Sequence, residues 1–358
     1  MEIAVRKEMS FCEDLRSLYN KGVHNLMKWS ELAAEVKAGV HGITRDTLDA
    51  ALVDVRNRTT TSAPMKPEGF YESVHNARWH HVVEVSGGEG MGMGVHEGKP
   101  QQSWTYMAVG QAVEKDDGVQ QSGAPRPRLM VLTSDKGWPY SWEEDKPIVD
   151  CYVNCEVDRV WQIVKGDVTE WFSPGPGTYF TPHPRVMIGT PGIGKSVAAG
   201  SYLLYQLLHY DVEELQVVVH CFGITMYVFD KTVKMVPVYM GNKTSKIVLG
   251  GLWQSGMKGY IIYDVARKGT PPETGFLPPT GWGMIVVSSP KASNYDEWEK
   301  QTKAARIIMN CPDEVDVKAM CVWITRGLEP DKQAGYLEMV EKRMDKVGML
   351  LCYTFDKL

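Results

Sequence analysis

RVMIGTPGIGKSVAAGSYLLYQLL, residues 185–208, is the stretch that decides the fold of this chain. Apolar residues lead into a run with three glycines, a lysine and a serine, and an apolar periodic segment follows. The run from Gly189 to Ser196 fits the pattern G-x-x-x-x-G-K-[ST] at every fixed position. A strand, a loop and a helix are therefore expected in the order that a phosphate-binding loop requires. A glycine-rich turn with an incidental Gly-Lys-Ser is the alternative.

The chemistry of phosphate binding explains these residue types. Glycines let the backbone curl so that successive N–H groups point inward, and a helix that starts at about Lys195 adds the positive end of its dipole. Lys195 is predicted to reach the β- and γ-phosphates, and the hydroxyl of Ser196 to bind Mg²⁺. The predicted cofactor is ATP or GTP with Mg²⁺. The predicted binding residues are Gly189, Thr190, Pro191, Gly192, Ile193, Gly194, Lys195 and Ser196.

GYIIYDV, residues 259–265, supplies the second acidic strand of a P-loop fold. Apolar and aromatic residues run into Asp264, which is predicted to hold Mg²⁺ with Ser196 or through a water. Val265 follows at the position where many additional-strand ATPases carry a Glu that orients the attacking water. The sequence therefore supports nucleotide binding better than fast turnover. Asp230 and Glu273 are candidate substitutes that only the tertiary structure could bring near.

Further candidates follow the next strand, GMIVVSSP, which ends with Ser288 and Ser289. Ser288 is a candidate γ-phosphate sensor and Asn294 a second one, with a serine-rich turn before Pro290 as the alternative. The Pro/Gly-rich insertion at 271–281 is expected to be a surface loop rather than a lid over the nucleotide. Three arginines are candidates for an arginine finger, and none is favoured: Arg267, Arg306 and Arg326.

The pattern along the chain predicts an α/β P-loop NTPase domain, a parallel sheet flanked by helices, preceded by a smaller α+β N-terminal region. The expected divisions are a helical segment at 1–58, an accessory region at 59–175 with short strands and a closing helix at 157–172, and the P-loop domain at 180–358. Five apolar runs are expected to be parallel strands: Val186–Ile188, Gln216–Cys221, Tyr260–Asp264, Met284–Ser288 and Arg306–Met309.

The composition is that of a folded soluble protein, with 43% hydrophobic and 23% charged residues among 358. A net charge of −5 and the lack of a Lys/Arg-rich run give no support for direct binding to nucleic acid or to a membrane. Seven scattered cysteines do not suggest a disulfide framework, and the charged start MEIAVRKEMSFCEDLR lacks the apolar core of a signal peptide. We expect an intracellular, reduced protein.

Other metal signals are weak. Cys151 and Cys155 have no second Cys or His pair at ligand spacing, so no zinc site is expected there. His80 and His81 begin a strand, and alternation turns adjacent side chains to opposite faces.

Many stretches of the chain resemble the retrotransposon hot spot (RHS) protein family of trypanosomes. Around the loop they include GSYLLYQLLHYD, KGYIIYDVA, GWGMIVVSSP and ARIIMNCPDEVDVKAMCVW. Upstream they include YESVHNARWHHVVEV, LMVLTSDKGWPYSW and CYVNCEVDRVWQIVKGDVTEWF. The resemblance covers nearly the whole chain.

This resemblance implies a multigene, retroelement-associated protein with an ATP- or GTP-binding loop at 189–196. It also implies nuclear, perinuclear or cytoplasmic residence and partners in transcription or RNA export. Family members usually extend past both ends of this sequence, so a truncated or internal portion is expected. A degenerate, non-functional copy is an alternative.

Three functions compete. A nucleotide-binding protein with slow or regulatory hydrolysis, acting through partners, fits the missing Glu and the large N-terminal region, and it ranks first. An active ATPase that drives a nucleic-acid-associated partner ranks second, because it needs a water-activating group. A P-loop kinase ranks last, because residues 265–282 offer only Arg267 and Lys268 to a basic lid.

Overall fold

The structure is a computed structural model, and it divides the chain into two compact units, residues 1–65 and 66–358. The residues that it describes are 12–23, 28–29, 32–59, 67–84, 92–110, 112–116, 125–172, 183–265 and 271–355.

The first unit is helical in its described part, as predicted. Residues 12–20 form a helix, followed by α3 (Ala34–Ala38) and α4 (Gly42–Thr59). Leu18 and Trp29 are buried, and the indole of Trp29 donates a hydrogen bond to Asp49 at 2.8 Å.

A seven-stranded sheet forms the centre of the second unit. Its spatial order is β10-β9-β8-β11-β12-β7-β13. Five strands are parallel, from β8 to β13 in that order, and β9 and β10 extend the sheet as antiparallel strands. The bounds are β7 Arg185–Ile188, β8 Val217–Phe222, β9 Thr225–Asp230, β10 Val238–Met240, β11 Gly259–Asp264, β12 Trp282–Ser288 and β13 Ala305–Ile308.

The five predicted parallel strands are confirmed, with ends shifted by one or two residues. Every residue of β11 and of β12 is buried, which explains their continuous apolar runs. β12 lies between β7 and β11, so the strand before the loop and the strand that ends at Asp264 are not neighbours. This is the strand order of the additional-strand ATPases, in which another strand separates the strand before the loop from the acidic strand.

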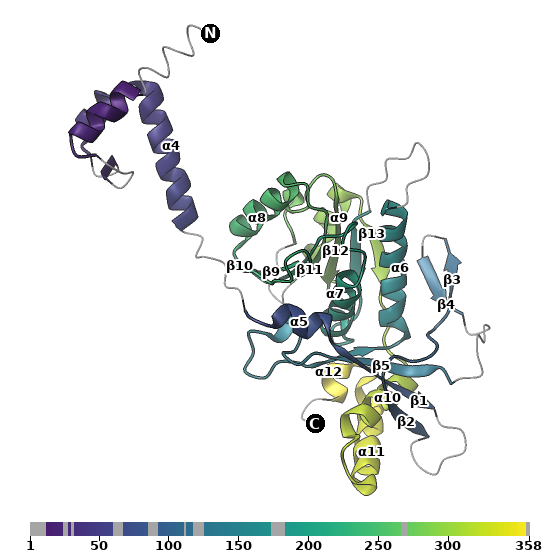
Figure 1. Cartoon of the computed structure of the whole chain (residues 1–358). Coiled ribbons are helices and arrows are strands. Elements are labelled where there is room, and N and C mark those ends of the chain that lie inside the picture. Colours follow the sequence, from purple (N-terminus) through teal and green to yellow (C-terminus); the bar gives the residue numbers. More distant parts are fainter. Residues whose placement is uncertain are drawn as a thin grey trace. The chain divides into compact units, whose positions relative to one another are not determined.

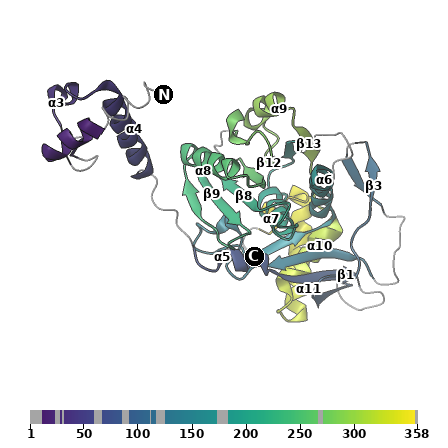
Figure 2. The same cartoon turned by 45° about the horizontal axis from the view of Figure 1, so that its top comes forward.

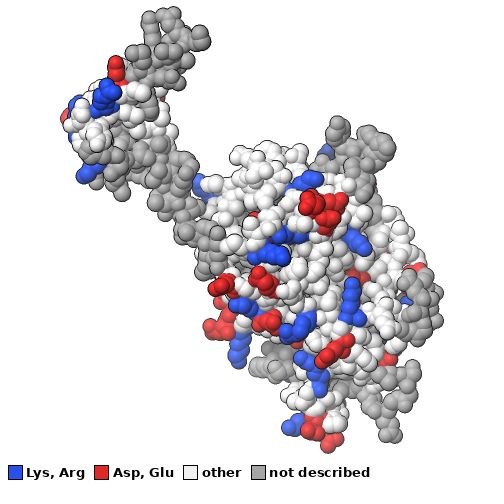
Figure 3. Space-filling model, viewed as in Figure 1, with Lys and Arg blue, Asp and Glu red and all other residues white. Residues whose placement is uncertain are grey.

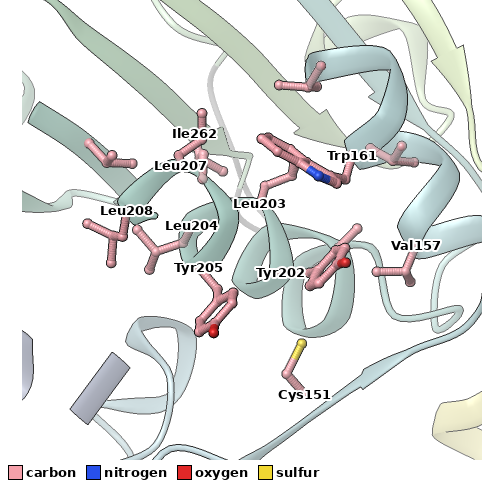
Figure 4. Packing of buried hydrophobic residues seen from close by; sticks show 14 of the residues in the cluster. Cys151, Val157, Trp161, Tyr202, Leu203, Leu204, Tyr205, Leu207, Leu208 and Ile262 are labelled. Carbon is pink, nitrogen blue, oxygen red and sulfur yellow. The ribbon is translucent and has the colours of Figure 1, made fainter. Parts of the chain in front are cut away.

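Helices pack on both faces of this sheet (Figures 1 and 2). One face contacts α6 (Cys155–Phe172) and α7 (Ser201–Leu208), and the other contacts α8 (Asn242–Gln254) and α9 (Asp296–Thr302). In Figure 4 the leucines of α7 lie beside Ile262 of β11 and Trp161 of α6. The predicted helix at 157–172 is therefore confirmed, beginning two residues earlier.

A second, antiparallel sheet belongs to the predicted accessory region. Its order is β2-β1-β5-β6, and β3 and β4 form a separate two-stranded ribbon. The strands are β1 Arg78–Glu84, β2 Met93–Glu97, β3 Tyr106–Val109, β4 Ala112–Lys115, β5 Pro127–Thr133 and β6 Asp150–Val153. Short helical segments precede β1 and β6: α5 Phe70–His75 and η1 Pro139–Ser141.

The accessory region and the loop region share one core. Buried residues of β5, β6 and α6 belong to the same hydrophobic cluster as those of α7 and the large sheet. On its other face, the antiparallel sheet packs against α10 (Glu314–Thr325), which follows the last parallel strand in sequence. Two helices complete the chain, α11 (Pro330–Val347) and α12 (Leu351–Thr354). The division at residues 175–180 stays a prediction.

Among the described helices, none is long and apolar enough to span a bilayer.

Candidate functional site

The loop between β7 and the following helix needs its glycines for two different reasons. Gly192 and Gly194 have φ angles of 84° and 94°, in the left-handed region where a side chain is strained. Gly189 has ordinary φ, but a Cβ there would lie 2.7 Å from the carbonyl oxygen of Met309. All three glycines of the motif are thus required by the backbone path.

The helix after the loop begins at Lys195, as predicted, but its first six residues form a π-helix, η2 (Lys195–Gly200), before α7. The carbonyl of Gly194 accepts hydrogen bonds from both Ala198 N and Ala199 N, at 2.7 and 3.1 Å. Single π turns are frequent at functional sites. Cys151 of β6 packs beneath this turn, and its buried thiol donates to the Ala198 carbonyl at 3.3 Å.

Lys195 folds back on its own loop. Its ammonium donates to the carbonyl oxygens of Gly189 and Thr190, both at 2.7 Å, and its side chain is buried. Burial lowers the pKa of Lys195, and the charge of Asp264 partly offsets this effect. A phosphate group would offer the same ammonium stronger, charged acceptors.

Asp264 lies at the end of β11 with one carboxylate oxygen unsatisfied. Burial raises the pKa of Asp264 to about 6, although a hydrogen bond to Ser196 and the charge of Lys195 both lower it. Oδ2 is buried and, among the residues that the structure describes, has no hydrogen-bond partner. A buried, unpartnered carboxylate oxygen beside a serine hydroxyl is a costly arrangement, and a hard cation with oxygen ligands would satisfy it. Asp264 and Ser196 therefore fit the predicted Mg²⁺.

Helix α12 presses on the outside of the loop. Cys352 N donates to the carbonyl of Gly192 at 3.4 Å, and a Cβ on Gly192 would overlap the sulfur of Cys352. Leu351 lies 3.7 Å from the Cβ position of Gly194. Nothing in the sequence of residues 351–354 signals this contact, because it joins segments about 160 residues apart.

We expect Gly192→Ala to destabilise the protein by more than the strain of a left-handed alanine, about 1–2 kcal/mol, because its methyl group meets Cys352. In a Cys352→Ala background the nearest side-chain atom is the Cβ at 3.4 Å, an ordinary contact. Urea unfolding of both single variants and the double variant measures the difference. An equal cost of Gly192→Ala in both backgrounds would show that α12 does not press on the loop.

The two predicted γ-phosphate sensors, Ser288 and Asn294, each donate a hydrogen bond to Ser289. Ser288 is buried on the sheet face opposite Asp264, in step with Met284 and Val286, and its hydroxyl donates to its neighbour's carbonyl at 3.0 Å. Asn294, in η4 (Ala292–Asn294), donates instead to the hydroxyl of Ser289 at 3.1 Å. Their role as sensors stays a prediction.

The candidate arginines have other partners. Arg306 pairs with Glu299 through both carboxylate oxygens and borders a cavity of about 570 Å³ along the outer edge of β13. Arg326 donates to the carbonyl of Trp323 at 2.7 Å and lies 3.7 Å over its ring. Arg267 lies outside the described residues.

The two substitute bases are also engaged elsewhere. Asp230 accepts hydrogen bonds from Thr232 and Val233 in a turn. It pairs with the first residue of β8, whereas Asp264 pairs with the last, so the two carboxylates lie at opposite ends of the strands. Glu273 is exposed and pairs with Lys246 of α8. The insertion at 271–281 packs through Phe276 on the same face as α8, which favours the surface-loop interpretation.

The accessory region places two residues, which the sequence analysis did not identify, at the end of the sheet where Asp264 lies. Tyr140 lies against Phe222 of β8, with ring centroids 4.6 Å apart, and Glu143 accepts a hydrogen bond from Thr225 at 2.8 Å. No local pattern in residues 138–145 indicates where this segment will dock.

The sheet order, the glycine loop and the acidic strand together define a P-loop protein. Two family models match the chain: "Retrotransposon hot spot protein, P-loop domain" over residues 186–358, and "Retrotransposon hot spot proteins N-terminal" over residues 71–183. The chain belongs to the retrotransposon hot spot protein family, as its resemblance indicated. No curated protein matches it.

Proposed function

We propose that this chain binds a nucleoside triphosphate with Mg²⁺ at residues 189–196 and hydrolyses it slowly. In this proposal the loop N–H groups and the Lys195 ammonium bind the phosphates, and Ser196 and Asp264 hold the metal. Mg²⁺, when bound, neutralises charge that develops on the phosphate oxygens.

The observation that carries the proposal is the unpartnered Oδ2 of Asp264 beside Ser196. A purely structural aspartate would find a hydrogen-bond donor at this depth, because an unsatisfied buried polar atom costs about 1–3 kcal/mol. Lys195 supports the proposal, because its ammonium is held at the loop by two backbone carbonyls that a phosphate can replace.

Thermal unfolding with ATP or GTP tests the proposal. We expect a higher Tm with Mg²⁺ and nucleotide than with either alone, and EDTA should reverse the gain. A folded protein whose Tm does not respond to ATP or GTP at millimolar concentration would overturn the proposal and favour a degenerate copy. The two nucleotides compared at equal concentration decide between ATP and GTP.

Nucleotide affinity should depend on pH through Asp264. Because its pKa is raised to about 6, the carboxylate that Mg²⁺ needs is mostly protonated at pH 5 and mostly charged at pH 7. We expect Mg-nucleotide binding to weaken about tenfold between pH 7 and pH 5. The stability of the unliganded protein should change with pH in the opposite direction to the affinity. The contribution of Asp264 to the free energy of unfolding is fully present below about pH 4 and is lost as the pH rises through 6.

Asp264→Asn is the control, since the phosphates themselves also titrate in this range. The ratio of wild-type to variant affinity removes the titration of the nucleotide and leaves that of Asp264. A ratio that stays constant from pH 5 to pH 7 would contradict a metal role for this carboxylate.

Partners in transcription or RNA export, and nuclear or perinuclear residence, are proposals that rest on the family alone. On the face of the molecule in Figure 3, Lys and Arg are interspersed with Asp and Glu. This mixed surface supports protein partners better than a polyanion. An active ATPase that drives such a partner is the alternative, and a turnover number raised by a partner would favour it.

A further inference from the structure

Three residues form one row across the edge of the sheet where the nucleotide is proposed to bind. Asp264 of β11 pairs with Phe222 of β8, and Phe222 pairs with Thr225 of β9. Because neighbouring strands are about 4.8 Å apart, the backbones of Thr225 and Asp264 lie about 10 Å apart. All three point to the face that α7 covers, because they alternate in step with residues of the α7 cluster, namely Ile262, Val218 and Tyr227.

A segment of the accessory region lies over the end of this row. The ring of Tyr140, in η1, contacts that of Phe222, and the carboxylate of Glu143 is held by Thr225 Oγ1 at 2.8 Å and Tyr227 OH at 3.4 Å. Both hydrogen bonds end on Oε1 of Glu143. Within the described residues Oε2 therefore keeps its capacity to accept a further hydrogen bond.

The position after Asp264 has no such group. Val265 is buried among the residues of the opposite sheet face, and its N–H donates to Val287 O at 2.9 Å. Asp230 lies at the other end of its strand, and Glu273 pairs with Lys246. Glu143 is therefore the residue whose carboxylate, among the described contacts, lies at this row on the β8 side of Asp264.

We propose that Glu143 orients the attacking water in nucleotide hydrolysis, so that the accessory region supplies the carboxylate missing after Asp264. This inference rests on the proposed function. The water oxygen bonds to the γ-phosphorus while the bond from that phosphorus to the β,γ-bridging oxygen breaks. Glu143 accepts a hydrogen bond from the water and takes its proton, which then passes to the released phosphate or to solvent. The products are the nucleoside diphosphate and inorganic phosphate.

Glu143→Gln tests the proposal on the full chain. The amide keeps the shape of the side chain and its carbonyl can still accept the hydrogen bond from Thr225, so the fold should be retained. Losing a general base costs about 10²–10⁴ in rate, and we expect kcat for Mg-ATP hydrolysis to fall at least 100-fold. The KM and the nucleotide-induced rise in Tm should stay unchanged, because Glu143 does not contact the loop. Glu143→Asp, which keeps a carboxylate one methylene shorter, should retain intermediate activity.

Glu144→Gln is the matched control, since it removes the same charge from the next, exposed position and should leave kcat within twofold of wild type. Turnover by Glu143→Gln at the wild-type rate would overturn the inference and leave the proposed nucleotide site standing. A wild-type protein that binds Mg-ATP but releases no phosphate above the Lys195→Ala background would also overturn it. A wild-type protein that shows no rise in Tm would instead overturn the proposed function itself.

Discussion

Lys195→Ala is expected to weaken nucleotide binding strongly while the fold survives. The ammonium is aimed at the loop, where charge-assisted hydrogen bonds contribute about 1.5–3 kcal/mol each, so affinity should fall about 100-fold or more. With ligand at 100 times the wild-type Kd, the wild type gains about 2.7 kcal/mol and the variant about 0.4 kcal/mol. For a unit of this size the wild-type Tm should rise by ~5–10 °C, and that of the variant by ~1–2 °C.

Lys231→Ala is the matched control for this experiment. Lys231 is equally buried, and its ammonium also donates to two backbone carbonyls, those of Leu207 and Tyr210, at the far end of the same helix. Both variants should lose some stability, because each leaves two carbonyls without a donor. Only Lys195→Ala should lose the response to nucleotide. An equal response in both variants would contradict a phosphate-binding role for Lys195.

Asp167→Asn is expected to have the largest effect on stability. Arg185, the first residue of β7, donates to both oxygens of Asp167 on α6 at 2.7 and 2.5 Å, and both residues are buried. Removing one charge leaves the guanidinium buried without its counterion, which costs about 3–5 kcal/mol. Urea unfolding should show a free energy of unfolding that is lower by that amount, with a correspondingly lower midpoint concentration.

Two further variants separate the effect of the buried charges from other effects of the substitution. Asp135→Asn breaks the exposed pair with Arg78 and should change the free energy of unfolding by at most about 0.5 kcal/mol. A double variant, Arg185→Met with Asp167→Leu, removes both charges and should recover most of the loss. If the double variant is as unstable as Asp167→Asn, the pair contributes through shape rather than through its charges.

The sequence by itself determined the parts whose signals are local. The loop from Gly189 to Ser196, the strand before it and the helix after it follow from glycine positions and apolar periodicity. The run into Asp264 is apolar because β11 is buried on both faces, so both the strand and its acidic end were predictable. The helix at 157–172 was also predictable, because its apolar residues recur with a period of 3.6 and face a core.

Only the tertiary structure decided which distant segments meet at these elements. The contacts of Cys352 with Gly192, of Cys151 with the π turn and of Glu143 with Thr225 each join residues 47–160 positions apart. A turn or a short helix has the same local sequence wherever it docks, because docking depends on the shape and polarity of a surface built by other segments. The side to which Ser288 points depends on its register in β12, which is set by the neighbouring strands. The loop could therefore be predicted from one stretch of the sequence, whereas the segments that surround it could be identified only from the tertiary structure.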